Sequence, residues 1–139
     1  MKLIDKVKLY ERIAHMDENP DLSDIKILVV EDETLDTALA QAYFHKLGCQ
    51  TEYVQNGKDA LEKLRDNEYD LCFMDVNIPT VNGLDVVKAL EKYGIKPCPI
   101  VALTGTEDKQ KCLDAGMDDY LNKPVTYEGL REKIIKHTQ

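Results

Sequence analysis

Five side chains with complementary chemistry stand at or just after short apolar runs in this chain. Asp75 ends one such run, and Glu31 and Asp32 directly follow an earlier one. Thr104 ends a later run, and Lys123 comes just after a fourth. Carboxylates held close together repel one another unless a cation relieves the repulsion, and Mg²⁺ prefers such oxygen ligands. With an ammonium group and a hydroxyl beside it, the same site suits a phosphoryl group, because phosphoryl transfer depends mostly on positioning and charge neutralisation.

Asp75 is the natural nucleophile of this set. It lies in the stretch Tyr69–Pro79, which we interpret as a central apolar strand followed at once by a turn. A carboxylate in that position can carry an aspartyl-phosphate. A backbone carbonyl near Asn77 could give a cation another oxygen ligand. Glu31 and Asp32 are neighbours that would diverge on an extended strand, so the turn there must bring both toward the cation.

Each of these residues also has an ordinary structural interpretation. An aspartate at a strand end, such as Asp75, usually forms a turn or caps a helix. Glu31 and Asp32 could cap the helix that follows them. Thr104 could fill the edge of a sheet, and Lys123 could stand in an ordinary loop. The functional interpretation therefore depends on whether the chain brings all of them to one place.

Strands and helices are expected to alternate from about residue 25. Short aliphatic runs are typical of strands buried on both faces, whereas the segments between them repeat apolar residues every three to four positions, as helices do. The expected strands are Ile25–Val30, Thr51–Val54, the run ending at Asp75, Ile100–Thr104 and Asp119–Asn122. The expected inward stripe of the first helix is Leu35, Ala38, Leu39, Ala42, Tyr43 and Leu47, and further helices are expected around Ala60–Leu64, around Leu84–Leu90, from Thr106 to Gly116 and from Thr126.

This alternation predicts an α/β fold with a parallel sheet, helices on both faces and right-handed crossovers. In such folds ligands bind beyond the carboxyl ends of the strands. Every candidate residue named above stands at a predicted strand end. The positions of these residues therefore favour the functional interpretation over five separate structural ones.

Residues 1–24 are expected to form an extension ahead of a domain at 25–139. Leu3, Val7, Tyr10 and Ala14 recur at helical spacing, and an acidic linker follows from Asp17 to Asp24. This helix could pack loosely on the domain or fray, or it could contact a second copy or another partner. The single stripe does not separate these alternatives.

Composition restricts the class of protein. The chain has 139 residues, of which 43% are hydrophobic and 32% charged, and its net charge of −8 disfavours nucleic acid or an anionic membrane as a partner. No apolar run approaches the roughly 18 residues of a membrane span, and charges near Met1 interrupt any signal-peptide core. We therefore expect a cytoplasmic protein. Its cysteines include no CxxC pair of the kind found in zinc sites, and we expect them to be reduced and structural.

The motifs together resemble the receiver domain of two-component response regulators, a family that includes chemotaxis regulators. The similar segments are Ile27–Glu33, Met74–Pro79 followed by Asn82 and Gly83, Ala102–Gly105 and Gly116–Pro124. They extend over about Ile25 to Lys136. The run Gly116–Leu121 is most similar to receivers of hybrid kinases and phosphorelays. The resemblance implies a doubly wound, flavodoxin-like fold with five parallel strands in the order 2-1-3-4-5.

The resemblance also implies a role for each site residue. Asp75 would accept a phosphoryl group from a histidine kinase or a histidine phosphotransfer protein. Glu31, Asp32, Asp75 and the Asn77 carbonyl would bind Mg²⁺ or Mn²⁺. Thr104 would be the switch hydroxyl, Tyr120 the aromatic residue that turns with it, and Lys123 the phosphate partner, with a Lys123–Pro124 bond that is cis. Glu31 replaces the family's commoner aspartate, and Gly105 its usual alanine.

The expected output is a switch in protein–protein contacts, with no enzymatic turnover beyond self-catalysed phosphorylation and dephosphorylation. An output protein would bind the surface formed by the fourth helix (Thr106–Gly116), the strand Asp119–Asn122 and the helix from Thr126, and a homodimer is an alternative.

A magnesium-dependent phosphatase of the haloacid-dehalogenase type is a second hypothesis, although Asn77 stands where that class has an acid. A module that binds partners without phosphorylation is a third. His15, His45 and His137 are expected to be surface or packing residues.

Overall fold

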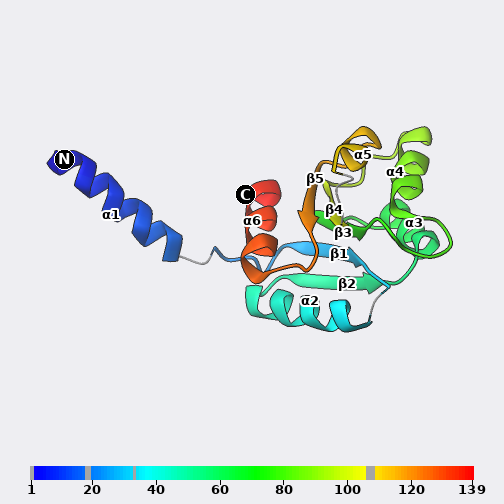
Figure 1. Cartoon of the computed structure of the whole chain (residues 1–139), viewed down its shortest axis with the longest axis horizontal. Helices are drawn as coiled ribbons and strands as arrows, with labels where there is room; N and C mark the ends of the chain where they lie inside the picture. Colours follow the sequence, from blue (N-terminus) through cyan, green and yellow to red (C-terminus); the bar gives the residue numbers. More distant parts are fainter. Residues whose placement is uncertain (1, 18–19, 33, 106–108) are drawn as a thin grey trace.

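The computed structural model describes residues 2–17, 20–32, 34–105 and 109–139. Its centre is a five-stranded sheet in the order β2-β1-β3-β4-β5, in which every neighbouring pair is parallel (Figure 1). The predicted topology is therefore confirmed. The strands are β1 (Lys26–Val30), β2 (Gln50–Val54), β3 (Leu71–Asp75), β4 (Ile100–Thr104) and β5 (Asp119–Asn122).

Six helices are described along the chain. They are α1 (Leu3–Asp17), α2 (Thr34–Leu47), α3 (Gly57–Asp66), α4 (Gly83–Lys92), α5 (Lys109–Asp114) and α6 (Tyr127–Thr138). Asparagine or threonine side chains cap α3, α4 and α6, where Asn56, Asn82 and Thr126 each accept a hydrogen bond from a backbone N–H three residues on. The predicted helix start at Thr106 lies outside the described residues.

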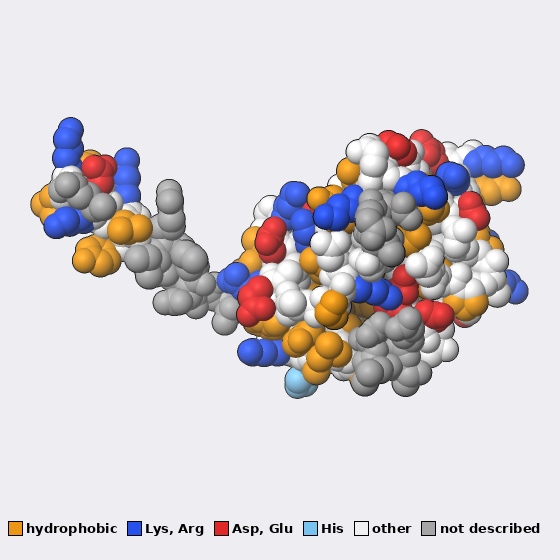
Figure 2. Space-filling view, in the orientation of Figure 1, with side chains coloured by type: hydrophobic (Ala, Val, Ile, Leu, Met, Phe, Trp, Pro, Cys, Tyr) orange, Lys and Arg blue, Asp and Glu red, His pale blue; other side chains and the backbone are white. Residues whose placement is uncertain are grey.

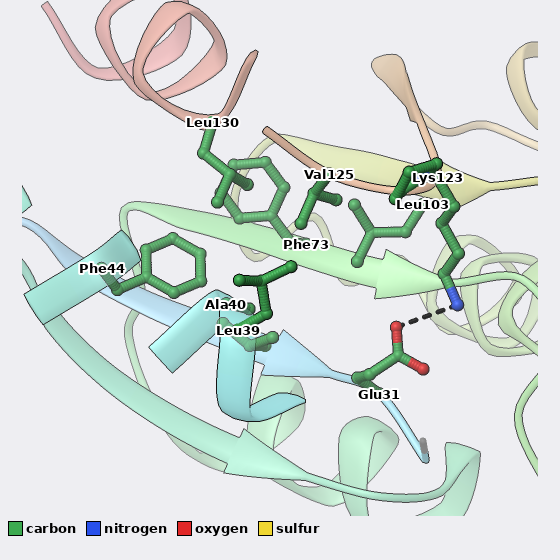
Figure 3. A pocket seen from close by; sticks show the side chains of 11 residues that line it. Glu31, Leu39, Ala40, Phe44, Phe73, Leu103, Lys123, Val125 and Leu130 are labelled. Atoms are coloured by element: carbon green, nitrogen blue, oxygen red, sulfur yellow. Dashed lines mark ion pairs between the residues drawn. The ribbon is translucent and has the colours of Figure 1, made fainter. Parts of the chain in front are cut away.

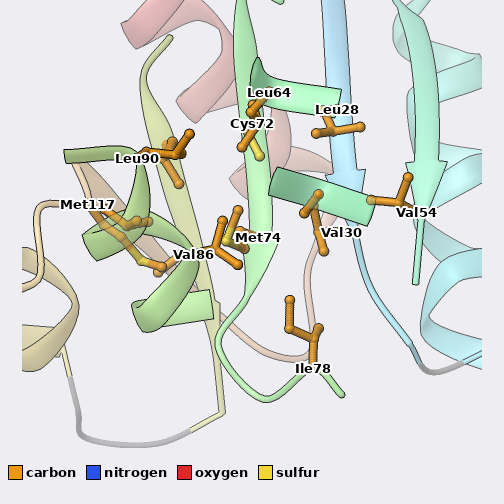
Figure 4. Packing of buried hydrophobic residues seen from close by; sticks show 14 of the residues in the cluster. Leu28, Val30, Val54, Leu64, Cys72, Met74, Ile78, Val86, Leu90 and Met117 are labelled. Atoms are coloured by element: carbon orange, nitrogen blue, oxygen red, sulfur yellow. The ribbon is translucent and has the colours of Figure 1, made fainter. Parts of the chain in front are cut away.

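Helices cover both faces of the sheet. One core cluster joins α3 and α4 to alternate strand residues such as Leu28, Cys72 and Met74 (Figure 4). The other joins α2 and α6 to the residues between them, such as Val29 and Phe73. Because successive side chains of a strand point to opposite faces, strands buried on both sides need apolar residues at successive positions, as β1 has after Lys26, β3 before Asp75 and β4 before Thr104.

The inward face of α2 differs from the predicted stripe. Phe44 and Ala40 are buried, and the Phe44 ring lies 5.7 Å from that of Phe73 between ring centroids. The predicted core residues Ala38, Leu39 and Ala42 are exposed instead. This helix carries apolar residues on almost every side, so periodicity alone could not identify the face that packs on the sheet.

Ahead of β1, residues 2–10 are exposed, whereas one residue of the segment 20–24 is buried. Figure 1 shows α1 projecting away from the sheet, and Figure 2 shows hydrophobic side chains on its surface. Leu3 and Tyr10 are 78% and 70% exposed. Leu22, in the acidic linker, is only 3% exposed and joins the core cluster of α2 and α6. Among the described residues, no helix has both the length and the apolar character to cross a membrane.

Candidate functional site

The candidate residues converge at the carboxyl edge of the sheet. In the parallel register, Val30 of β1 lies opposite Met74, and Asp75 of β3 lies opposite Leu103. Thr104 of β4 lies opposite Asn122, and the N–H of Lys123 donates to the Thr104 carbonyl at 2.8 Å. The strands that carry these residues therefore end side by side, as the sequence predicted.

Three carboxylates form a compact oxygen-donor set at this edge. One ligand atom each from Glu31, Asp32 and Asp75 lies within 4.8 Å of the other two. The turn after β1 thus brings both neighbouring acids to Asp75, as expected. Glu31 and Asp75 are buried and Asp32 is exposed, so the set faces solvent on one side. Hard oxygen ligands of this kind, open to water on one side, fit a small divalent cation.

Lys123 neutralises part of this negative charge. Its Nζ lies 2.6 Å from Asp75 Oδ2 and 3.0 Å from Glu31 Oε2, and Figure 3 shows the lysine reaching Glu31 from the end of β5. The Lys123–Pro124 peptide bond is cis.

The pKa values of Glu31 and Lys123 report this crowding. Burial raises the pKa of Glu31 to about 7, and the nearby Asp75 adds to the rise while Lys123 opposes it. Burial alone would lower the pKa of Lys123, but its contacts with Asp75 and Glu31 outweigh burial and raise that pKa above its usual value. The charged form of Glu31 is therefore disfavoured in this position, and a cation bound beside it would favour that form.

The loop between β3 and α4 holds Asn77 beside Asp75. The N–H of Asn77 donates to Asp75 Oδ1 at 2.9 Å. Backbone hydrogen bonds attach the two ends of the loop, from the N–H of Val76 to the carbonyl of Leu103 and from the N–H of Gly83 to the carbonyl of Val76. Asn77 is thereby kept next to the carboxylates, where its carbonyl was expected to serve.

Thr104 and Tyr120 lie on the same face of the sheet. Tyr120 pairs with Ala102 on β4, and Thr104 follows Ala102 by two positions, so both side chains point to the side covered by α3 and α4. Thr104 is 4% exposed, and Tyr120 is partly buried. The Nζ atoms of Lys109 and Lys133 lie 4.9 Å and 5.9 Å from the centre of the tyrosine ring.

An apolar pocket adjoins the site between α2 and α6 (Figure 3). The Glu31–Lys123 ion pair lies at one end of this pocket, and Phe44, Phe73 and Leu130 line its interior. Leu39, which is 41% exposed, stands at its mouth. The pocket therefore places exposed apolar surface next to the charged residues of the site.

A second charged cluster was not predicted. Asp119, at the start of β5, accepts contacts from Lys133 Nζ at 3.2 Å, Lys136 Nζ at 3.1 Å and His137 Nε2 at 2.9 Å. Burial favours a raised pKa for Asp119, but the bond from His137 and the other donors lower it. The spacing of the three α6 residues, three and four positions apart, was the available signal, since it places them on one helix face. His137 is thus a packing residue, and His45 is exposed, as expected; the side chain of His15 lies outside the described residues.

Comparison with known proteins identifies the family. A family model for the response regulator receiver domain matches residues 27–135. The aerobic respiration control sensor protein ArcB of Escherichia coli K12 is 38% identical over 127 residues, which cover 88% of this chain and 16% of that protein. Hybrid signal transduction histidine kinase K of Dictyostelium discoideum is 33% identical over 129 residues, covering 83% of this chain and 11% of that protein. The chain therefore belongs to the response regulator receiver domain family, and it spans only a small part of these relatives.

Solved structures agree with this assignment. A chain in the co-crystal structure of the Saccharomyces cerevisiae histidine phosphotransfer protein Ypd1 with the receiver domain of the response regulator Ssk1 matches with a TM-score of 0.79 and 28% identity, covering 86% of this chain and 92% of that one. A sensor histidine kinase receiver domain from Pseudomonas aeruginosa PAO1, with a magnesium ion coordinated in its active site cleft, matches with a TM-score of 0.76 and 28% identity, covering 83% and 98%. This protein is accordingly a phosphoacceptor receiver domain of two-component and phosphorelay signalling.

Proposed function

We propose that Asp75 is the residue that accepts the phosphoryl group, from a histidine kinase or a histidine phosphotransfer protein, and that its phosphorylation switches protein–protein contacts. The observation that carries this proposal is the surroundings of Asp75. Its carboxylate is buried at the end of the central strand, 2.6 Å from an ammonium group and within 4.8 Å of ligand atoms from two further acids. A turn-forming or capping aspartate has no need of such surroundings.

The same proposal includes a divalent cation, Mg²⁺ or Mn²⁺. Glu31, Asp32, Asp75 and the Asn77 carbonyl would hold it, and the close grouping of the three carboxylates supports this assignment. When bound, the cation would neutralise charge on the carboxylates and on the incoming phosphoryl oxygens. The magnesium ion in the Pseudomonas aeruginosa receiver domain supports this assignment.

The chain's own residues then divide the work of phosphoryl transfer. An Asp75 oxygen attacks phosphorus, the bond from phosphorus to the donor's imidazole nitrogen breaks, and the imidazole leaves with that electron pair. The Nζ of Lys123 already donates a hydrogen bond to Asp75. It pairs with the negatively charged phosphoryl oxygens as the phosphoryl group is transferred to Asp75. The Thr104 hydroxyl donates a hydrogen bond to the new phosphoryl group, and Tyr120, on the same face of the sheet, turns with it.

Two surfaces serve the partners in this proposal. The donor approaches over the pocket between α2 and α6, because exposed Leu39 and the apolar lining there lie directly beside Glu31 and Lys123. The output protein binds the surface of α5, β5 and α6, which carries Tyr120.

We assign residues 25–139 to the receiver and residues 1–24 to an extension of it, and we place the protein in the cytoplasm. Chemistry is limited to phosphorylation and loss of the phosphoryl group.

Phosphoryl transfer from a labelled donor tests the assignment of Asp75. Acetyl phosphate or a phosphorylated histidine phosphotransfer protein, supplied with Mg²⁺, is expected to label the wild type and not Asp75→Asn. Asp85→Asn is the matched control, because Asp85 lies exposed in the first turn of α4 and its loss leaves the site intact. Equal labelling of the wild type and Asp75→Asn would refute the assignment.

A further inference from the structure

Gly57, the first residue of α3, lies against the loop that follows Asp75. Its N–H donates a hydrogen bond to the carbonyl of Pro79 at 3.2 Å, and the residue is buried. Because Pro79 is in the loop between β3 and α4, the start of α3 contacts the segment that carries Asn77. The two segments are far apart in the sequence, so this contact depends on the fold.

The contact leaves no space for a side chain at position 57. A Cβ atom built on Gly57 would lie 1.8 Å from the carbonyl oxygen of Val81 and 2.7 Å from its carbonyl carbon. Both are backbone atoms, which cannot rotate aside as the end of a side chain can. To reach an ordinary separation, the Val81 carbonyl would have to move by more than about 1 Å. Glycine is therefore required here by space.

The same loop is fixed closely at its other points. The N–H of Val76 donates a hydrogen bond to the carbonyl of Leu103, and the N–H of Gly83 donates one to the carbonyl of Val76. A Cβ on Gly83 would lie 2.7 Å from the carbonyl oxygen of Asp75. Asn77 lies between these fixed points and Pro79. A displacement imposed at Val81 and Pro79 would therefore act on a loop whose two ends are held, and Asn77 is part of that loop.

We propose that Gly57 is a positioning residue for the cation site. By packing directly against the loop between β3 and α4, the start of α3 keeps the Asn77 carbonyl at the distance a cation needs. This inference rests on the proposed function, because it assumes that the Asn77 carbonyl is a ligand. Mg²⁺ demands near-ideal octahedral geometry, so a displacement of a fraction of an ångström at one ligand weakens binding. Partners that orient metal ligands typically change metal affinity by about 10- to 100-fold when they are altered.

The coupling must act in both directions. If α3 sets the position of the loop, then a cation that fixes the loop must also fix the contact between Gly57 and Pro79, since coupling between two sites is reciprocal. The Gly57 amide is not a ligand in the proposed site. Protection of that amide by a bound cation is therefore a signature of the coupling.

Titration with Mg²⁺ alone tests the proposal without phosphorylation. We expect Gly57→Ala to bind Mg²⁺ at least about tenfold more weakly than the wild type, measured by calorimetry or NMR on the folded protein. Gly48→Ala is the matched control. Gly48 has a φ of +82° and open space around it, so an alanine there strains the backbone and leaves the loop alone. It should bind Mg²⁺ as the wild type does.

Hydrogen exchange in the wild type gives a second measurement that needs no variant to fold. We expect Mg²⁺ to slow exchange of the Gly57 amide, while the amide of exposed Gly94 keeps its rate. If the wild type binds Mg²⁺ but Gly57→Ala binds it equally well, or if the Gly57 amide is unaffected, the inference is overturned and the proposed function stands. If the wild type binds no divalent cation, the proposed metal site itself is wrong.

Discussion

Removing the charge of Lys123 should destabilise the cation-free protein more than removing the charge of Asp75. Lys123→Met keeps most of the side-chain volume but leaves Glu31 and Asp75, each with a side chain only 4% exposed, facing one another without an ammonium group. Asp75→Asn leaves the pair between Lys123 and Glu31, at 3.0 Å, in place. It also removes the neighbour that helps to raise the pKa of Glu31.

The structure sets the expected size of each effect. Breaking a buried ion pair by removing one partner costs about 3–5 kcal/mol. The lysine here is 19% exposed, and Glu31 can take up a proton, so we expect Lys123→Met to lose about 2–4 kcal/mol at pH 8. Asp75→Asn should change stability by no more than about 1 kcal/mol. The double variant should be more stable than Lys123→Met, since the repulsion is then gone.

Urea unfolding at pH 8 in the presence of a chelator measures all three variants. Repeating the series in saturating Mg²⁺ should narrow the gap between Lys123→Met and the wild type, because the cation then neutralises the same carboxylates. If Lys123→Met loses less than about 0.5 kcal/mol, or if the two substitutions are additive, the charges do not interact as the distances indicate.

Three further predictions follow from other parts of the structure. The apparent affinity for Mg²⁺ should weaken about tenfold from pH 8 to pH 6, because Glu31, whose pKa is about 7, must lose its proton to bind; a flat calorimetric profile would contradict this. Asp119→Asn should cost about 1–3 kcal/mol at pH 7. Because the pKa of Asp119 is lower in the folded state, the stability difference between the wild type and Asp119→Asn should shrink as the pH falls below the unfolded-state pKa of 3.8. Urea unfolding at pH 7 and at a pH below 3.8 would show this. Leu22→Ala should lose about 2–4 kcal/mol in the same assay, whereas Leu3→Ala, at a residue 78% exposed, should change stability by less than about 0.5 kcal/mol.

The sheet and its site could be predicted because both depend on local patterns. A run such as Leu71–Asp75 is too short and too apolar to be anything but a strand buried on both faces, and parallel strands carry their polar ends to one edge. The carboxyl edge of the sheet therefore brings Asp75, Glu31 and Lys123 together, as their positions at the predicted strand ends indicated. The distances among them, and the pKa values that follow, required the fold.

The features that sequence reasoning missed depend on contacts between distant segments. Phe44 was overlooked because α2 is apolar on nearly all sides, and only the docked helix shows which side meets Phe73. Leu22 is a single leucine in an acidic linker and has no periodic pattern. The partners of Asp119 come from α6, which reaches β5 only after both have packed on the sheet. The close approach of Gly57 to Val81 has the same origin.

Binding of beryllofluoride with Mg²⁺ tests whether Asp75 is the phosphoryl acceptor, since this phosphoryl mimic needs the acceptor, the cation and the neighbouring donors at once. The backbone amides of Thr104 and Lys123 can be followed by NMR as the mimic is added to the wild type and to Asp75→Asn. We expect one tight complex in the wild type, with both amides shifting together, and no complex in the variant. Equal binding to both proteins, or a complex that leaves Thr104 and Lys123 unchanged, would contradict it.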